Sequence, residues 1–359
     1  MKKIILILVV LLLGKFAFSQ NKEEAEKLVK EGVGYHDKGN YEGAIVRYDK
    51  ALQLDKDNLI ALTEKAYSLM GLEKYNEAIT LCEKAIATHP KHPDLKTVYV
   101  NCGTAYDFLK KTDKAIEIYE NGIREFPGYY LLHFNKGISL YSVNRNKEAQ
   151  LSFQQAVVSN PEHAGSHSII ARMAQMDKRA IPALLAYARF FAVEPQGKRA
   201  KENLSNLKKL MEANAKKTGE NSISINLDLN GAVNSAMSGK TAEDNFSSAE
   251  LILSLQAAMD LGEKDKGKNE NKSEAESFAS RFETVISALS EGKKEGRGFF
   301  WDYYVPYFLE MKEKKFLETF SNLVFASSEN EDVLKWLKEH KKETDEFFKW
   351  SDSFDWVKG

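Results

Sequence analysis

Residues 130–163 read YLLHFNKGISLYSVNRNKEAQLSFQQAVVSNPEH, and this stretch carries the pattern of two helices joined by a turn. Small residues stand where the two helices would cross, bulky residues fill the space beside the crossing, and a proline ends the second helix. These positions are Gly137 and Ala149, Leu140 and Phe153, and Pro161, with Ala156 where a following unit would pack. The stretch therefore predicts a helix-turn-helix unit whose apolar face a neighbour must cover.

The same pattern recurs upstream with a period of 34 residues, which is typical of a repeat architecture. The third unit starts three residues late, and its extra residues, around Pro93 to Leu95, fall in a predicted turn. A fifth, degenerate unit begins near Ala164. The matching positions in the first three units are Gly32, Tyr35, Ala44, Tyr48 and Ala51; Ala66, Leu69, Ala78, Cys82, Ala85 and Pro90; and Gly103, Tyr106, Ala115, Tyr119, Gly122 and Pro127.

Over about residues 25–197 this pattern resembles the tetratricopeptide repeat. The resemblance implies an all-α fold in which helix pairs stack into a solenoid, because each unit leaves an apolar face that only a neighbour covers. We predict five such repeats plus a capping helix within residues 20–217. The lysine-rich capping helix, over residues 198–217, would give the array a polar outer end. Residues 218–359 match no named family and are predicted to form a small helical domain.

In this family the first helix of each unit lines a concave groove that holds an extended peptide or a helix. The resemblance places these largely apolar and aromatic candidates in the groove: Tyr67, Met70, Asn101, Phe108, Phe134, Asn135, Ile138, Tyr141 and Arg172. Asn101 and Asn135 match a position from which family members hydrogen-bond a ligand backbone. The Lys/Asn cluster that clamps a terminal carboxylate in some members is missing, since Val29 and Val33 occupy two of its positions. The alternative is a groove covered by the C-terminal region.

The first nineteen residues have the features of a secretory signal peptide. Two lysines precede an apolar run over residues 4–13, and Ala17-Phe18-Ser19 offers small residues at cleavage spacing. We therefore expect residues 1–19 to be removed and the protein to be exported, to the periplasm, with no membrane span after cleavage. An uncleaved membrane anchor is the alternative, although a run of this length is short for a bilayer.

The overall composition is that of an ordinary soluble protein of about two domains. The chain has 359 residues, of which 43% are hydrophobic and 29% charged, and a formal net charge of -1, so nothing favours a nucleic-acid partner. Its two cysteines, Cys82 and Cys102, fall at helix-packing positions. Two small buried residues are expected there, and a disulfide is the alternative.

The C-terminal region begins with one predicted strand, in which Ile223, Ile225, Leu227 and Leu229 alternate with polar residues. This strand would pair with a partner further along the chain, pack as an arm on the last repeat, or add to another chain. Helices are predicted over residues 246–261, 273–289, 299–327 and 331 to about 350, with a charged linker over 262–272.

Aromatic residues are concentrated in this region, which holds all four tryptophans and the run FFWDYYVPYFLEM over residues 299–311. Aromatic side chains dominate both small cores and binding hot spots. Core packing and a partner- or ligand-facing patch are therefore both open for Trp301, Tyr303, Tyr304 and Tyr307.

No pattern nominates catalytic residues, a metal site or a cofactor. His163 and His167 are four residues apart, but His167 falls at a packing position that His133 fills in the preceding unit. We predict a non-catalytic, exported scaffold that binds a protein or peptide segment in its apolar groove, with a C-terminal domain that docks or dimerises. The alternative is an enzyme or small-ligand-binding protein with its site in the C-terminal domain.

Overall fold

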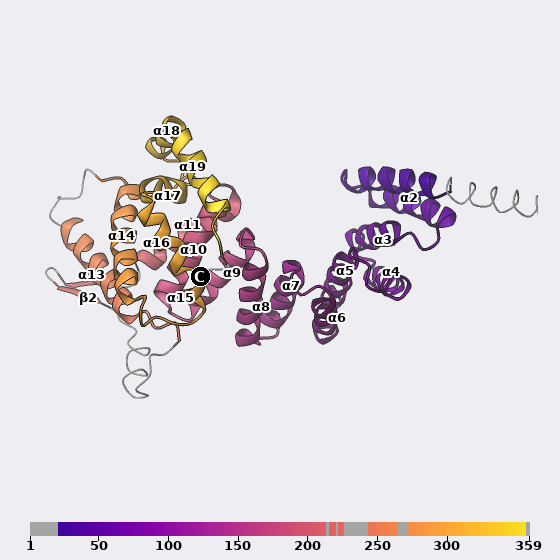
Figure 1. The fold of residues 1–359 in the computed structure, drawn as a ribbon, viewed down its shortest axis with the longest axis horizontal. Helices are drawn as coiled ribbons and strands as arrows, with labels where there is room; N and C mark the ends of the chain where they lie inside the picture. Colours follow the sequence, from indigo (N-terminus) through magenta and orange to yellow (C-terminus); the bar gives the residue numbers. More distant parts are fainter. Residues whose placement is uncertain (1–20, 213–214, 220–221, 226–242, 265–271, 357–359) are drawn as a thin grey trace, which may run out of the picture. The chain divides into compact units, whose positions relative to one another are not determined.

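The computed structural model describes residues 21–356 except 213–214, 220–221, 226–242 and 265–271 (Figure 1). The chain is built from helices in a repeated arrangement, as predicted, and it divides into two compact units, Met1–Ser159 and Asn160–Gly359. The predicted signal peptide, residues 1–19, lies outside the described residues.

The first unit is a stack of helix pairs. Its elements are a helix over residues 21–36, α2 (Tyr41–Leu54), α3 (Leu59–Gly71), α4 (Tyr75–Thr88), α5 (Leu95–Phe108), α6 (Thr112–Glu125), α7 (Tyr130–Ser142) and α8 (Asn146–Ser159). Each helix packs against the next, and the first helices α3, α5 and α7 also contact one another in sequence. The extra residues of the third repeat lie between α4 and α5, in the predicted turn.

An aromatic ring packed over a glycine fixes the crossing in three of these pairs. A Cβ on Gly32 would lie 2.3 Å from Cε1 of Tyr48, and one on Gly103 would lie 2.4 Å from Cε1 of Tyr119. Gly137 has the same relationship with Phe153. In the second repeat Ala66 replaces the glycine and Cys82 replaces the aromatic residue, and both are buried. The methyl group of Ala66 is therefore matched by a smaller side chain on the second helix. Cys82 and Cys102 are free and buried.

The turn within each helix pair contains one residue in the left-handed backbone region. These residues recur at one position of the repeat: Gly39, Glu73, Lys110, Asn144 and Lys178. Glycine adopts this conformation without a steric penalty, whereas the four other residues carry a Cβ into it. The tight turn is therefore imposed by helix packing rather than by local preference.

The second unit begins with the fifth helix pair. Its elements are α9 (Ala164–Met176), α10 (Ala180–Val193), α11 (Lys198–Glu212), β1 (Ala215–Gly219), β2 (Ser222–Ile225), α13 (Ser247–Lys264), α14 (Glu274–Gly292), α15 (Phe299–Tyr303), α16 (Val305–Glu313), α17 (Leu317–Val324), α18 (Glu331–Glu339) and α19 (Lys341–Asp352).

Helix α10 explains why the division into compact units falls between Ser159 and Asn160. The domain boundary expected between residues 217 and 218 stays a prediction. Every residue of α10 from Ala180 to Ala192 is buried, because α9, α11, α13 and α17 all pack against it. An ordinary amphipathic helix of a repeat keeps one polar face. The fifth helix pair is thus the core of the C-terminal unit, and Pro182 stands in the first turn of α10, where a proline is tolerated.

The predicted strand is half of a small hairpin, and its partner was predicted on the wrong side. β2 pairs antiparallel with β1, which precedes it, so that Lys217 faces Ile223 and Ala215 faces Ile225. Thr218 and Gly219, in the polar segment before residue 222, belong to β1. Leu227 and Leu229 lie outside the described residues.

The aromatic run over residues 299–311 belongs to the core of the second unit, together with the fifth helix pair. Trp301, Tyr303, Tyr304 and Tyr307 are all buried, and Phe308 packs edge-on against Phe282 of α14. Core packing, rather than a surface patch, is therefore the role of the four aromatic residues left open above.

Candidate functional site

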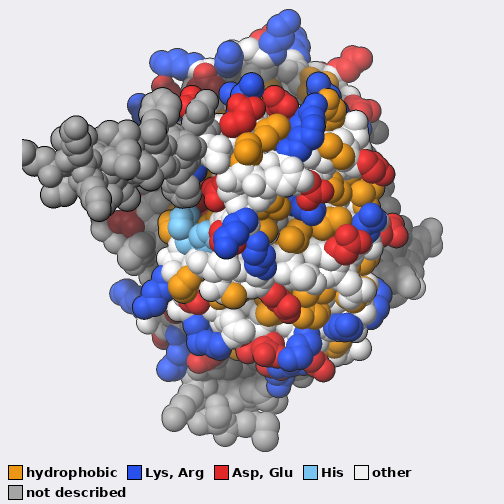
Figure 2. Space-filling view, turned by 90° about the vertical axis from the view of Figure 1, so that its right-hand side faces the viewer, with side chains coloured by type: hydrophobic (Ala, Val, Ile, Leu, Met, Phe, Trp, Pro, Cys, Tyr) orange, Lys and Arg blue, Asp and Glu red, His pale blue; other side chains and the backbone are white. Residues whose placement is uncertain are grey.

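One set of exposed apolar side chains lies on the first helices of the first unit. They are Ile60 and Tyr67 on α3, Phe108 on α5, and Ile138 and Tyr141 on α7. Because α3 contacts α5 and α5 contacts α7, these side chains belong to one surface, which we call the first-helix face. Figure 2 shows how apolar side chains lie between acidic and basic ones on one side of the molecule.

The predicted groove residues divide into three groups in the structure. Tyr67, Phe108, Ile138 and Tyr141 are exposed on the first-helix face. Met70, Phe134 and Asn135 are half-buried, and Asn101 is buried. Arg172 is exposed on α9, which belongs to the second unit. The structure therefore brings four of the nine predicted residues together as an accessible surface of one unit.

The two predicted asparagines are less available than the resemblance implies. Nδ2 of Asn135 donates a hydrogen bond of 2.8 Å to the carbonyl oxygen of Leu131, one turn earlier in α7. Asn101 is buried in α5. Their predicted role toward a ligand backbone remains a prediction.

Two of the exposed rings are held from one side by aromatic stacking. The Tyr67 ring lies 4.6 Å from the imidazole of His36, and the Phe108 ring lies 4.9 Å from that of Tyr75, both in stacked geometry. Stacked neighbours restrict rotation of the side chain and leave the other ring face free for contact. Tyr67 and Phe108 are therefore partly ordered before any partner arrives.

Polar contacts fix the register between neighbouring first helices. Nδ1 of His36 lies 2.8 Å from Oγ of Ser68 on α3. Ser139 of α7 donates a hydrogen bond of 2.5 Å to Oδ2 of Asp107 on α5, and the hydroxyl of Tyr119 donates to the same oxygen at 3.3 Å. Burial raises the pKa of Asp107 above its usual range.

A second acidic residue, Glu64, is half-buried on α3. Burial raises the pKa of its carboxyl group, and the charge of Asp37 acts in the same direction, while His36 opposes them. The sequence analysis did not select Glu64 or Asp107. The repeat phase was the available signal, since Glu64 stands at the position of Asn101 and Asn135, and Asp107 at that of Met70 and Tyr141.

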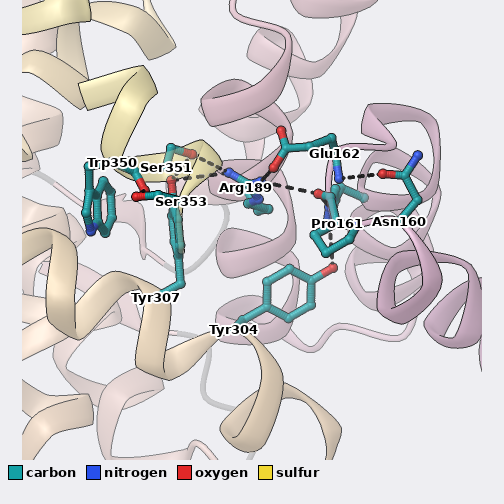
Figure 3. Close-up of polar contacts among 10 residues, drawn as sticks. Asn160, Pro161, Glu162, Arg189, Tyr304, Tyr307, Trp350, Ser351 and Ser353 are labelled. Carbon is teal, nitrogen blue, oxygen red and sulfur yellow. Dashed lines mark hydrogen bonds and ion pairs between the residues drawn. The ribbon is translucent and has the colours of Figure 1, made fainter. Parts of the chain in front are cut away.

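In the second unit, a buried cluster is centred on Arg189 of α10 (Figure 3). Its Nη1 donates to Oγ of Ser351 at 2.8 Å and to the hydroxyl of Tyr307 at 3.2 Å. Its Nη2 donates to the carbonyl oxygen of Pro161 at 3.3 Å and pairs with the carboxylate of Glu162. The guanidinium also lies 4.8 Å from the ring of Tyr307.

His167 extends this cluster from α9. Its Nδ1 lies 2.8 Å from the hydroxyl of Tyr304, and its Nε2 lies 2.8 Å from the carbonyl oxygen of Pro161. Burial lowers the pKa of the imidazole to about 3, and the charge of Arg189 contributes. In the first unit, His133 makes the same contact with the carbonyl oxygen of Pro127, at 2.7 Å. Both histidines therefore have the predicted packing role.

Two pockets open elsewhere in the second unit. One of about 190 Å³ lies beside Leu207 and Phe278, and one of about 730 Å³ lies beside Glu318 and Trp336. Neither pocket is lined by the four aromatic residues considered above, Trp301, Tyr303, Tyr304 and Tyr307.

In the described ranges, His, Cys, Asp and Glu side chains form no group of three suited to a metal ion. No helix in these ranges has the length and hydropathy needed to cross a bilayer.

Comparisons with known proteins agree with the repeat pattern. The tetratricopeptide repeat family profile matches residues 57–124, and a second profile, for a TPR repeat, matches residues 33–72. The chain is 30% identical over 139 residues to the protein STIP1 homolog of Dictyostelium discoideum. It is 30% identical over 148 residues to an Hsp70-Hsp90 organizing protein of Triticum aestivum.

These alignments cover 38% and 39% of this chain but only 25% and 24% of the two relatives. The chain therefore spans about a quarter of their length. A solved structure of pilF from Pseudomonas aeruginosa is similar with a TM-score of 0.48 and 20% identity, over 54% of this chain and 86% of that one.

Helix pairs at a fixed period, with a small residue of the first helix packed against the second, define a helical repeat protein of the type that mediates protein–protein interaction. The matched residues identify the repeat: residues 33–124 of the chain contain tetratricopeptide repeats.

Proposed function

We propose that this chain is a scaffold that binds a protein or peptide segment on the first-helix face. The observation that carries the proposal is the set of exposed apolar and aromatic side chains on three adjacent helices. Tyr67 is 49% exposed and Phe108 is 55% exposed, although each is ordered by a stacked neighbour. A concentration of apolar surface with preordered rings is typical of a site where a partner docks.

The comparisons support a binding role of this general kind. The wheat relative is named an Hsp70-Hsp90 organizing protein, which describes a protein that assembles others. The site need not take the same ligands, because Val29 and Val33 stand where some family members carry a carboxylate clamp. No observation favours a reaction, since the polar groups around Arg189 and His167 bond to one another.

Two double variants with matched exposure test the proposal. Tyr67→Ala/Phe108→Ala removes the exposed rings of the first-helix face. Leu151→Ala/Val158→Ala removes side chains that are 61% and 52% exposed on the second helix α8. In crosslinking from the native cell envelope, we expect the first variant to lose the partners of the wild type and the second to keep them. Retention of the same partners by both variants would reject the proposal.

We further propose that the protein works after export and removal of residues 1–19. The features that support this are the lysine-flanked apolar run and the small residues before Gln20. Mass spectrometry of the protein purified from its native source is expected to find Gln20 at the N-terminus. An intact terminus in the cytoplasmic fraction would contradict export.

Dimerisation through the second unit remains a prediction, to be checked by light scattering.

A further inference from the structure

We propose that the first-helix face selects a partner segment that carries Lys or Arg side chains among its apolar ones. This inference rests on the proposed function and specifies the partner chemistry at the same surface. Two half-buried carboxylates, Glu64 and Asp107, lie among the exposed rings of this face, and neither forms an ion pair with a described residue.

Glu64 provides the first of these carboxylates. It precedes Tyr67 by three residues on α3, so the two side chains are neighbours on the helix surface. No hydrogen bond or ion pair holds the Glu64 carboxylate within the described part of the chain. Burial raises the pKa of this carboxyl group, His36 lowers it, and Asp37 raises it. The neighbouring Lys65 forms an ion pair with Asp49 instead, with 2.5 Å between Nζ and Oδ1. A cationic group from a partner would compensate the charge that burial leaves poorly solvated.

Asp107 provides the second carboxylate, next to Phe108 at the end of α5. Both of its hydroxyl donors, Ser139 and Tyr119, approach the same oxygen, Oδ2. Within the described residues, its other oxygen accepts no hydrogen bond. Neutral donors orient the carboxylate but leave its charge in place. Lys110, in the turn that follows α5, acts on it electrostatically without an ion pair between the two.

The arrangement therefore combines apolar contact area with two half-buried negative charges, of which that of Asp107 is oriented by hydrogen bonds. A Lys or Arg side chain reaches such a carboxylate while its methylene stem packs on an adjacent ring. A segment with acidic side chains in place of these cations would meet like charge in a partly desolvated setting, which costs affinity and slows association. Charge complementarity thus favours a basic, amphipathic segment over an acidic one.

The test uses the mature chain and three labelled peptides that share one pattern of leucines. Their polar positions are all Lys and Arg, all Gln, or all Glu, and binding is measured by fluorescence anisotropy at two salt concentrations. We expect the basic peptide to bind about tenfold more tightly than the neutral one, equivalent to about 1.4 kcal/mol, and the acidic peptide to bind most weakly. This preference should shrink at high salt.

Variants that neutralise one charge each test whether Glu64 and Asp107 cause the preference for the basic peptide. Glu64→Gln and Asp107→Asn keep the shape of each side chain. Each is expected to weaken binding of the basic peptide about threefold and to leave binding of the neutral peptide unchanged. Glu77→Gln and Asp113→Asn remove the same charges from exposed positions on the second helices α4 and α6, and should have little effect. Unchanged melting of each variant checks that the fold is intact.

The outcomes separate the two proposals. Equal affinity for the three peptides, with loss of binding in Tyr67→Ala/Phe108→Ala, would overturn the charge preference and leave the docking surface. Equal effects of the first-helix and second-helix charge variants would also overturn it. Binding that survives the double ring variant would overturn the docking surface itself, as would failure of all three peptides to bind.

Discussion

The hydroxyl of Tyr304 lies 2.8 Å from Nδ1 of His167, although 137 residues separate them in the chain. The other ring nitrogen of His167 meets the carbonyl oxygen of Pro161, so both nitrogens are used within the core. A fully buried imidazole with two such partners is neutral, because the charged form would lose its hydration. The hydrogen bond thus links the fifth helix pair to the aromatic helices, and protonation of His167 would place a buried charge at this link.

This relationship predicts acid sensitivity of the second unit. The pKa of His167 falls from 6.5 to about 3 on folding, so the unfolded chain binds a proton more readily than the folded one. His167 therefore contributes its full share of stability above pH 6.5, and that share is lost as the pH falls toward 3. The loss is about 1.4 kcal/mol in the free energy of unfolding for each pH unit below 6.5.

Urea unfolding followed by tryptophan fluorescence measures this loss, because all four tryptophans belong to the second unit. Between pH 7 and pH 5 the wild type is expected to lose more stability than His167→Gln, which cannot titrate, by about 2 kcal/mol. Half-buried carboxyl groups titrate in both proteins and cancel in the comparison. Parallel pH profiles for the two proteins would show that His167 does not become charged on unfolding.

Replacing Arg189 is predicted to lower the stability of the same unit more strongly. Its buried guanidinium donates to Ser351, Tyr307 and the Pro161 carbonyl, so Arg189→Met removes the donor that these three groups share. We expect the free energy of unfolding of the second unit to fall by about 3 kcal/mol. Arg172→Met, at an exposed position on α9, should change it by less than about 0.5 kcal/mol. A similar loss in both variants would show that the buried hydrogen bonds are not the cause.

The repeat units could be predicted from sequence because their contacts are local. Gly103 and Tyr119 are sixteen residues apart and recur with the period, so phase alone places one against the other. Arg189 and Ser351 are 162 residues apart, and no periodicity connects them. The division at residue 159 follows from such distant contacts, which periodicity does not reveal.

The same reasoning explains the outcome for the binding surface. Phase identified exposed first-helix residues such as Tyr67 and Phe108, because helix periodicity fixes which side faces out. It could not identify Glu64 or Asp107 as partner-facing, since a carboxylate on a helix is usually solvated. Their importance depends on half-burial and on the donors around them, which arise only when neighbouring repeats pack.

Packing of a ring over Gly103 predicts the effect of a single methyl group. In Gly103→Ala the new Cβ would lie 2.4 Å from Cε1 of Tyr119, so the buried ring must move. Overpacking costs about 1–3 kcal/mol, which exceeds the gain in helix propensity of about 1 kcal/mol from replacing glycine by alanine. Chemical denaturation followed by circular dichroism should therefore find a net loss.

Gly34→Ala is the matched control for this prediction. A Cβ at Gly34 would meet no atom within 4 Å, so only the propensity gain remains. We expect this variant to be more stable than the wild type by up to about 1 kcal/mol. Equal stabilisation by both substitutions would mean that the rings do not pack over the glycines.

The left-handed turn residues predict that glycine stabilises one position and destabilises another. Lys110 has a φ of 59° in the turn between α5 and α6, where its Cβ is strained and glycine would not be. Lys110→Gly should therefore raise the free energy of unfolding by about 0.5–1 kcal/mol. Lys50→Gly makes the same replacement at an exposed position inside α2, and should lower it by about 1 kcal/mol. Both values come from denaturation followed by circular dichroism. If both substitutions destabilised the protein equally, the Lys110 turn would not be strained, and its recurrence in every repeat would need another cause.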